Sequence, residues 1–205
     1  LLYAGQRAPD IVGRLEYTGA WGTAILTAAA HEIRDILTRD DGWGFAVQGC
    51  LKVNLPMIGA GDALFLNGVY ARGAVAYAGF GPGGGIVGQG VGQGGGVTST
   101  FGASDAWVDA TGEIRQSEAW GFYGAFLHFW TPQVRQLVFG GVNFLDVAEG
   151  AGRPAILFDH HAWQVGSHLV WSPVRALDIG LEVLYRRIDS DNRITAHGPS
   201  LSIGS

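Results

Sequence analysis

The sequence predicts an all-β fold, a transmembrane antiparallel up-and-down β-barrel, and three observations support this prediction. Polar and apolar residues alternate with a period of two over many segments, which places one kind of side chain on each face of a strand. Many of these segments have about the 9–11 residues that cross a bilayer at the tilt of a barrel strand. Short and long connections alternate along the chain, as in barrels with tight turns at one rim and long loops at the other.

The two clearest strands are predicted at residues 43–55 and 177–185. In the first, apolar side chains such as Val47 alternate with polar ones such as Gln48, and in the second the same alternation surrounds Glu182. Weaker alternation predicts strands at residues 11–18, 23–32, 63–77, 119–131, 135–144 and 162–171, with another beginning at 200. Only a strand with one polar and one apolar face explains such a period.

The connections between these strands fall into two groups. The short ones contain the Pro, Gly or Asp of tight turns and lie at residues 18–22, 56–62, 131–134 and 172–176. The long ones lie at residues 33–42, 79–118, 145–161 and 189–199. Because Gly loses the most backbone entropy on ordering, the Gly-rich segment 79–96 predicts a flexible surface loop, with a loop folded into the lumen as the alternative.

A barrel that spans a bilayer must turn its polar side chains toward a hydrated interior, since Arg or Lys facing lipid at the midplane would cost about 2–4 kcal/mol. The residues predicted to line this interior are Arg14, Glu16, Gln48, Lys52, Asn54, Asn67, Gln164, His168, Asp178, Glu182 and Arg186. Amphipathic aromatic residues near strand ends are typical of the girdles at the two membrane interfaces. The predicted girdle residues are Tyr17, Trp21, Trp43, Tyr70, Trp130, Trp171 and Tyr185.

Composition argues against several other classes of protein. No apolar run reaches the roughly 18 residues of a membrane-spanning helix. The chain is only 15% charged, with a net charge of −5 and no basic patch, which argues against nucleic-acid binding. The single cysteine, Cys50, cannot form an intramolecular disulfide, and no Cys/His cluster has metal-site spacing. Because no nucleophile motif occurs, we predict neither enzymatic activity nor a cofactor or metal.

Seven segments follow one another along nearly the whole chain: residues 9–12 (PDIV), 20–22 (AWG), 41–48 (DGWGFAVQ), 61–66 (GDALFL), 128–132 (HFWTP), 163–173 (WQVGSHLVWSP) and 177–185 (LDIGLEVLY). Together, and in this order, they resemble the alphaproteobacterial porin family. The ordered set is far more specific than any one of its motifs.

The resemblance implies a sixteen-stranded barrel in the bacterial outer membrane, of which residues 1–205 would form about half. The chain would be one partial domain without the N-terminal half and the last strand, and the family's inward-folded constriction loop would lie in the missing half. The resemblance further implies a homotrimer that contacts outer-membrane lipid and lipopolysaccharide. Its function would be passive diffusion of small hydrophilic solutes and ions through a water-filled channel.

Two other classes of function stand beside this interpretation. A soluble or outer-membrane barrel that binds a small ligand without conducting is the main alternative, and a soluble barrel would turn its apolar face inward. A barrel-embedded enzyme would need a catalytic pair at the rim, and the sequence contains no such motif. Asp178 and Glu182 share a face and could act as paired carboxylates, but Arg186 on the same face favours a salt-bridged wall.

Overall fold

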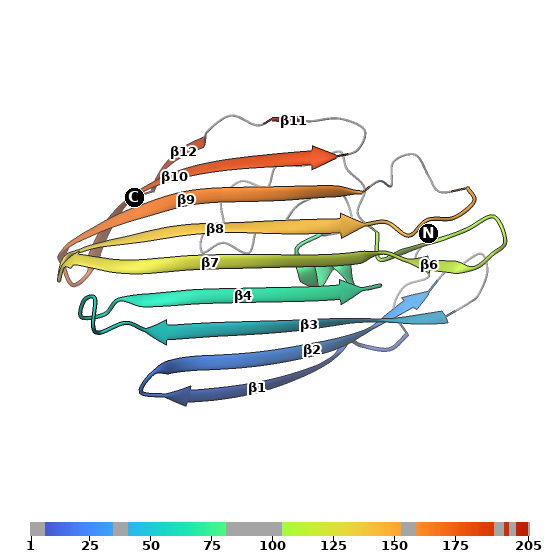
Figure 1. Ribbon diagram of the computed structural model, residues 1–205, viewed down its shortest axis with the longest axis horizontal. Coiled ribbons are helices and arrows are strands. Elements are labelled where there is room, and N and C mark those ends of the chain that lie inside the picture. Colours follow the sequence, from blue (N-terminus) through green and yellow to red (C-terminus); the bar gives the residue numbers. More distant parts are fainter. Residues whose placement is uncertain are drawn as a thin grey trace.

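The computed structural model describes residues 7–34, 41–80, 104–152, 159–190, 195–196 and 200–204, and its main feature is one broad antiparallel sheet (Figure 1). Eight long strands form it in chain order: β1 (Ile11–Gly19), β2 (Gly22–Arg34), β3 (Asp41–Asn54), β4 (Ala63–Arg72), β7 (Glu118–Thr131), β8 (Val134–Asp146), β9 (His160–Val174) and β10 (Leu177–Ser190). Each pairs antiparallel with the next, which confirms the predicted all-β, up-and-down fold.

Four short strands and one 3₁₀ helix accompany this sheet in the described part of the chain. β11 (Thr195–Ala196) and β12 (Ser200–Gly204) both pair with β10, and β5 (Ala106–Val108) with β6 (Ile114–Gln116) forms a separate hairpin. A 3₁₀ helix, η1 (Val75–Ala78), follows β4. No helix in the described ranges is long and apolar enough to cross a membrane.

The connections alternate in length as the sequence predicts. Two residues separate β1 from β2, β7 from β8 and β9 from β10, and all these turns lie at one end of the sheet, called here the turn end (Figure 1). At the opposite end, the loop end, residues 73–117 separate β4 from β7 and residues 147–159 separate β8 from β9. Long connections at one rim and tight turns at the other are the arrangement of outer-membrane barrels.

The β3–β4 turn, residues 55–62, is the longest at the turn end, and a buried carboxylate ties it to β7. Asp62, only 1% exposed, lies 2.6 Å from His128 through Oδ2 and Nδ1, and its Oδ1 accepts a 2.9 Å hydrogen bond from the backbone N–H of Phe129. Two of the segments that resemble porins, residues 61–66 and 128–132, therefore meet in space. This contact gives a structural reason for both motifs.

The strand predicted at residues 63–77 ends at Arg72 because Gly73 leaves the extended conformation. Gly73 has a φ of 62°, which glycine adopts without steric cost, and the 3₁₀ helix η1 begins at Val75. The chain passes very close to β3 here, since a Cβ atom on Gly44 would lie 2.0 Å from the Gly73 carbonyl oxygen. Two glycines thus allow the chain to turn over the end of β3.

The strand register divides the sheet into two faces. The polar face carries a row of directly paired residues from β3 to β10, namely Cys50, Asn67, Tyr123, Gly141, Gln164 and Arg186. The adjacent row on the apolar face is Leu51, Leu66, Gly124, Gly140, Val165 and Tyr185. Because side chains alternate along each strand, these two rows assign the residues of β3 to β10 to one face or the other, and the pairing of β2 with β3 and of β1 with β2 extends the assignment.

The sheet curves toward its polar face. One hollow is lined by polar side chains of six successive strands: Gln48, Asn67, Tyr123, Asn143, Gln164 and Arg186. Five strand spacings of about 4.8 Å would keep β3 and β10 roughly 24 Å apart in a flat sheet. Side chains from all six strands can meet around one hollow only if the polar face is concave, as on the inside of a barrel wall.

The start of the β4–β7 connection covers the loop end of this concave face. Val75, Ala78 and Phe80 are buried against a row of small residues that includes Ala46 and Ala71. The Phe80 ring meets the His160 ring edge-on at 5.4 Å. Of the segment predicted as a flexible surface loop, Gly79 and Phe80 lie on the concave side, and residues 81–96 fall outside the described part of the chain.

Large side chains on the concave face lie over glycines of neighbouring strands. A Cβ on Gly166 would lie 2.5 Å from Cζ of Phe139, and one on Gly180 would lie 2.7 Å from Nε2 of His168. Side chains converge on the inside of a curve, so a bulky residue needs a small one beside it. This packing requirement accounts for glycines within strands, where glycine otherwise weakens a sheet.

We predict that Gly44→Ala lowers the free energy of unfolding by roughly 1–3 kcal/mol, because the new methyl group meets backbone that must move. Gly68→Ala on the apolar face is the matched control: a Cβ there has no atom within 4 Å. We expect this control to change stability by less than about 0.5 kcal/mol. Urea titration in detergent micelles, followed by tryptophan fluorescence, measures both. Equal destabilisation by the two variants would contradict the proposed close passage.

Candidate functional site

The eleven residues predicted to line a channel all lie on the concave polar face. Register places Arg14 and Glu16 of β1, Gln48, Lys52 and Asn54 of β3, Asn67 of β4, Gln164 and His168 of β9, and Asp178, Glu182 and Arg186 of β10 on this one side. They come from five of the eight long strands. Their role in lining a channel stays a prediction, and a shared face is what that role requires.

Most cations on this face have a partner close by. Arg14 pairs with Glu16 on the same strand. Arg135 of β8 donates to Asp178 at 2.7 Å, and the Nζ atom of Lys52 lies 5.8 Å from the centre of the Phe65 ring. These contacts hold the charged groups in defined places on the wall.

The salt-bridged wall expected from Asp178, Glu182 and Arg186 does not form. Asp178 instead binds Arg135 and the hydroxyl of Ser172 from neighbouring strands. Residues four positions apart on a strand are about 13 Å apart, which is too far for an ion pair, whereas residues on adjacent strands are close. Residues that share a face of a strand are therefore not necessarily in contact.

The hollow lies at the centre of the concave face, and it encloses about 610 Å³ of space, counting the part open to solvent. Its floor is two adjacent rows of paired residues that contribute the amides of Gln48, Asn67, Asn143 and Gln164. Tyr77, Ala78 and Gly79 form its roof.

Sequence reasoning missed Tyr123 and Asn143 in this floor, and Tyr77 in its roof. The signal for Tyr123 and Asn143 was weak, because their face of β7 and β8 also carries glycines and large apolar residues such as Phe139. Polarity therefore alternates poorly along these two strands. Alternation predicts an extended strand at Tyr77, and nothing in the sequence indicates that the chain turns at Gly73.

A cluster of carboxylates and a histidine fastens the roof to the sheet. The Tyr77 hydroxyl donates to Asp10 Oδ2 at 2.5 Å, and Asp10 Oδ1 lies 2.8 Å from Nδ1 of His31 on β2. The backbone N–H of Val75 donates to Asp105 Oδ1 at 2.6 Å, and Asp105 Oδ2 lies 3.8 Å from Nε2 of the same histidine. Two carboxylates on opposite sides of one imidazole thus bind η1, Asp105 at Val75 and Asp10 at Tyr77.

This hydrogen bonding changes the acidity of the groups in the cluster. Donation to Asp10 is the main reason that the pKa of Tyr77 rises to about 12, and burial adds to it. Burial acts to raise the pKa of Asp10, but the hydrogen bonds from Tyr77 and His31 outweigh it and hold this pKa below its ordinary value. At neutral pH the contact therefore joins a neutral phenol and a carboxylate.

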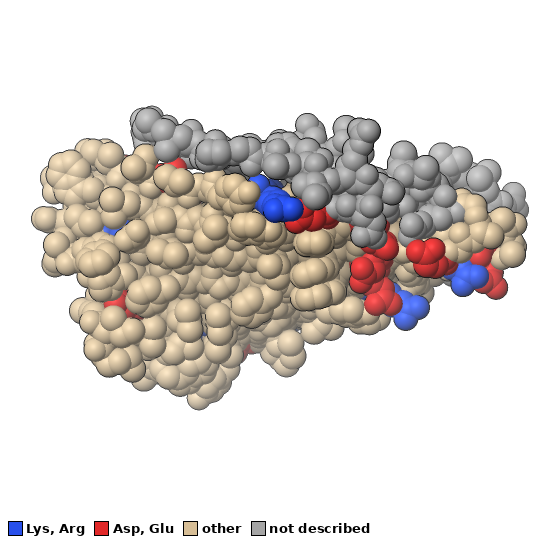
Figure 2. Space-filling model, turned by 45° about the horizontal axis from the view of Figure 1, so that its top comes forward, with Lys and Arg blue, Asp and Glu red and all other residues tan. Residues whose placement is uncertain are grey.

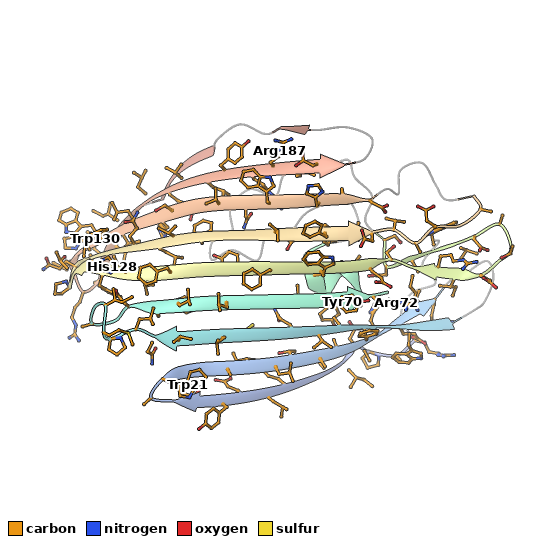
Figure 3. All side chains as sticks on the ribbon, in the orientation of Figure 1. Trp21, Tyr70, Arg72, His128, Trp130 and Arg187 are labelled. Atoms are coloured by element: carbon orange, nitrogen blue, oxygen red, sulfur yellow. The ribbon has the colours of Figure 1, made fainter. Side chains whose placement is uncertain are left out.

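The apolar face is exposed and carries most of the predicted girdle. Tyr17, Trp43, Tyr70, Trp130, Trp171 and Tyr185 lie on it, and Trp21 lies in the β1–β2 turn. Trp21 and Trp130 lie at the turn end and Tyr70 lies toward the loop end (Figure 3). Their role at a membrane interface stays a prediction.

Three further rings lie on the apolar face toward the loop end: Trp120, Phe144 and Trp163. Trp120 stacks on Phe144 with ring centres 4.1 Å apart and an angle of 11° between the rings, and Trp163 packs on Tyr185 at 5.2 Å. These rings are cross-strand neighbours, so the contacts follow from the register. Trp120 and Phe144 stand near the ends of predicted strands and were identifiable by the same signal as the others.

Charged side chains leave most of the face in Figure 2 free and lie mostly toward its loop end, with one further group nearer the middle. Glu118 accepts a 2.9 Å hydrogen bond from the Tyr70 hydroxyl and lies 3.6 Å from Arg72. On β10, Arg187 pairs with Asp189 at 2.7 Å, and because Arg187 is directly opposite Trp163, this pair lies level with the rings. A wide uncharged surface bounded by a zone of rings and charges is the pattern of a surface that meets a bilayer.

We predict that Tyr77→Phe frees the roof of the hollow, because it removes the hydroxyl that binds Asp10. Hydrogen–deuterium exchange of the backbone amides at residues 75–80 should then become at least several times faster. Tyr70→Phe is the control, since its hydroxyl binds Glu118 on the apolar face and should leave this exchange unchanged. Unchanged exchange in Tyr77→Phe would contradict the anchoring role.

The same contact predicts an effect of acid. The folded-state pKa of Asp10 is depressed, so its stabilisation is complete above the ordinary value of 3.8 and is lost as pH falls through the folded pKa. Exchange at residues 75–80 should therefore accelerate below about pH 4. In Asp10→Asn this acceleration should be absent once the rates are corrected for the intrinsic exchange rate.

Comparison with known proteins gives two findings. The sequence matches a family described as the porin subfamily over residues 2–202. The fold matches the crystal structure of the outer membrane channel DcaP of Acinetobacter baumannii with a TM-score of 0.67 and 17% sequence identity, covering 98% of this chain and 49% of that one. The chain therefore spans about half the length of the channel that it matches. No curated protein sequence matches it.

Proposed function

The chain belongs to the porin subfamily, and from that premise we propose that it forms part of the wall of a water-filled channel through the bacterial outer membrane. Small hydrophilic solutes and ions would cross this channel by passive diffusion, with no covalent step. The observation that supports the proposal is the division of one curved sheet into a concave face with polar groups and a convex face of exposed apolar side chains.

The convex face has the chemistry of a surface in contact with lipid. Leu15, Val138, Leu181 and Val183 are each between 46% and 72% exposed there. In water, such an extended apolar surface would be strongly unfavourable, at about 25 cal/mol per Å². In a bilayer the same surface is in its preferred solvent, and the aromatic groups at its two ends would lie at the interfaces.

We propose outer-membrane lipid, lipopolysaccharide and further copies of the chain in a homotrimer as partners. The charged groups beyond the loop-end rings support contact with lipopolysaccharide headgroups at that rim. In the described part of the chain, the sheet ends at β1 on one side and at β11 and β12 on the other. These edges support a barrel closed by further strands, because an unpaired backbone group in lipid costs several kcal/mol.

The alternative of a soluble ligand-binding barrel fits this geometry poorly. Such a barrel turns its apolar residues inward, whereas here they lie on the convex side. A membrane barrel that binds a ligand without conducting keeps the same faces, so an electrical measurement is needed to separate it from a channel.

We expect the complete barrel that contains this chain to give uniform stepwise conductance in a planar lipid bilayer. Lys52→Glu should shift the reversal potential in a salt gradient toward cation preference, and Glu182→Lys should shift it toward anion preference, because both side chains lie on the concave wall. A silent bilayer containing correctly folded protein would contradict the channel and favour the ligand-binding barrel.

Two adjacent residues on β10 test which face meets lipid. Val183 lies on the convex face and Leu184 on the concave face, so Val183→Arg places a charge in lipid and Leu184→Arg places it in water. Val183→Arg should destabilise the protein in phospholipid vesicles by about 2–4 kcal/mol. Leu184→Arg should cost clearly less in the same urea titration. A larger loss for Leu184→Arg would reverse the proposed orientation.

A further inference from the structure

One cation on the concave face differs from the others. Arg186 lies in the floor of the central hollow, directly paired with Gln164 of β9 and two rows away from Glu182 on its own strand. Within the described part of the chain it has no hydrogen bond or ion pair, and its Nε atom is buried without an acceptor. Arg14 and Arg135 on the same face each have a carboxylate partner.

A buried donor atom without an acceptor, such as Nε of Arg186, is unusual. Arg carries five N–H donors in a planar fork and keeps its charge at any physiological pH. Buried donors in folded proteins nearly always have an acceptor, and each exception needs an explanation. The acceptor that a guanidinium fits best is an oxyanion, which it binds through two parallel hydrogen bonds.

The groups around Arg186 would favour such a ligand. Gln164 and Asn143 line the hollow and have no hydrogen bond from their side-chain amides within the described ranges, so both can donate to a solute. No carboxylate lines the hollow itself. Asp10, which binds the roof through Tyr77, is already paired with His31. One unpaired positive charge among neutral donors thus lines this part of the wall.

We propose that Arg186, with Gln164 and Asn143, forms an oxyanion-binding subsite in the channel wall, which takes the carboxylate or phosphate of a small solute beneath η1. This inference rests on the proposed channel function and deepens it by assigning a substrate class. The roof of the hollow confines the solute against the wall, so a permeating anion pauses at Arg186 before it moves on. Transport of such a solute saturates, whereas free diffusion does not.

The test measures uptake of radiolabelled succinate, and separately of phosphate, into proteoliposomes that contain the complete channel. The initial rate is recorded against solute concentration for the natural protein, Arg186→Gln and Arg135→Gln. Both substitutions remove one positive charge from the concave wall, but Arg135 is already paired with Asp178. Arg135→Gln therefore controls for the general effect of wall charge on anion flux.

We expect the rate in the natural protein to saturate and the half-saturating concentration to rise roughly tenfold in Arg186→Gln, a change equivalent to about 1.4 kcal/mol. Arg135→Gln should raise it much less, and Arg186→Lys should restore part of the loss. Saturation with succinate alone identifies the oxyanion as a carboxylate, and saturation with phosphate alone identifies it as a phosphate. Either result supports the subsite.

Other outcomes would overturn the inference. Linear uptake of both anions, in vesicles that conduct potassium chloride, would show a channel without the subsite. Equal changes of the half-saturating concentration in Arg186→Gln and Arg135→Gln would show that Arg186 acts only through the general charge of the wall. Vesicles that conduct no ions at all would instead contradict the proposed channel function, so the two failures are distinguishable.

Discussion

Antiparallel backbone pairing between strands that are neighbours in the chain is the constraint on which the rest of this structure depends. It satisfies the backbone polar groups within the sheet, which a bilayer would otherwise leave without partners. It also fixes the register, and one residue of slip would turn every polar side chain of a strand to the opposite face. The continuous rows from Cys50 to Arg186 and from Leu51 to Tyr185 are products of that register.

The curvature of the sheet adds a second constraint, on the size of the side chains that fit on each face. Crowding on the inside of the curve explains why Phe139, His168 and Asn143 each lie over a glycine of a neighbouring strand. On the outside the crowding is weaker: Gly49 and Gly68 have no atom within 4 Å of the place of a Cβ, and the nearest atom to that of Gly140 is 3.3 Å away. Glycine within the strands therefore has its main packing role on the concave face.

The fold and the faces were predictable from the sequence because period-two alternation reports side-chain direction, and Gln48, Lys52 and Glu182 all fall on the expected side. Contacts between strands were not predictable, because alternation says nothing about which residues are opposite each other. Asp178 binding Arg135 and the isolation of Arg186 both depend on that cross-strand order. The turn at Gly73 was also missed, since its positive φ and its passage over Gly44 depend on tertiary structure.

If the two aromatic groups lie at the membrane interfaces, as predicted, their separation sets the thickness of the bilayer that the sheet fits. Trp120 and Trp130 mark the two ends of β7 and lie about ten residues apart, or about 33 Å along the strand at about 3.3 Å per residue. A barrel strand tilted by about 40° then spans roughly 25 Å of depth, which is the height of the apolar band in outer-membrane barrels. A thicker bilayer would have to thin locally around this protein, and that elastic cost would favour its retention in a thin membrane.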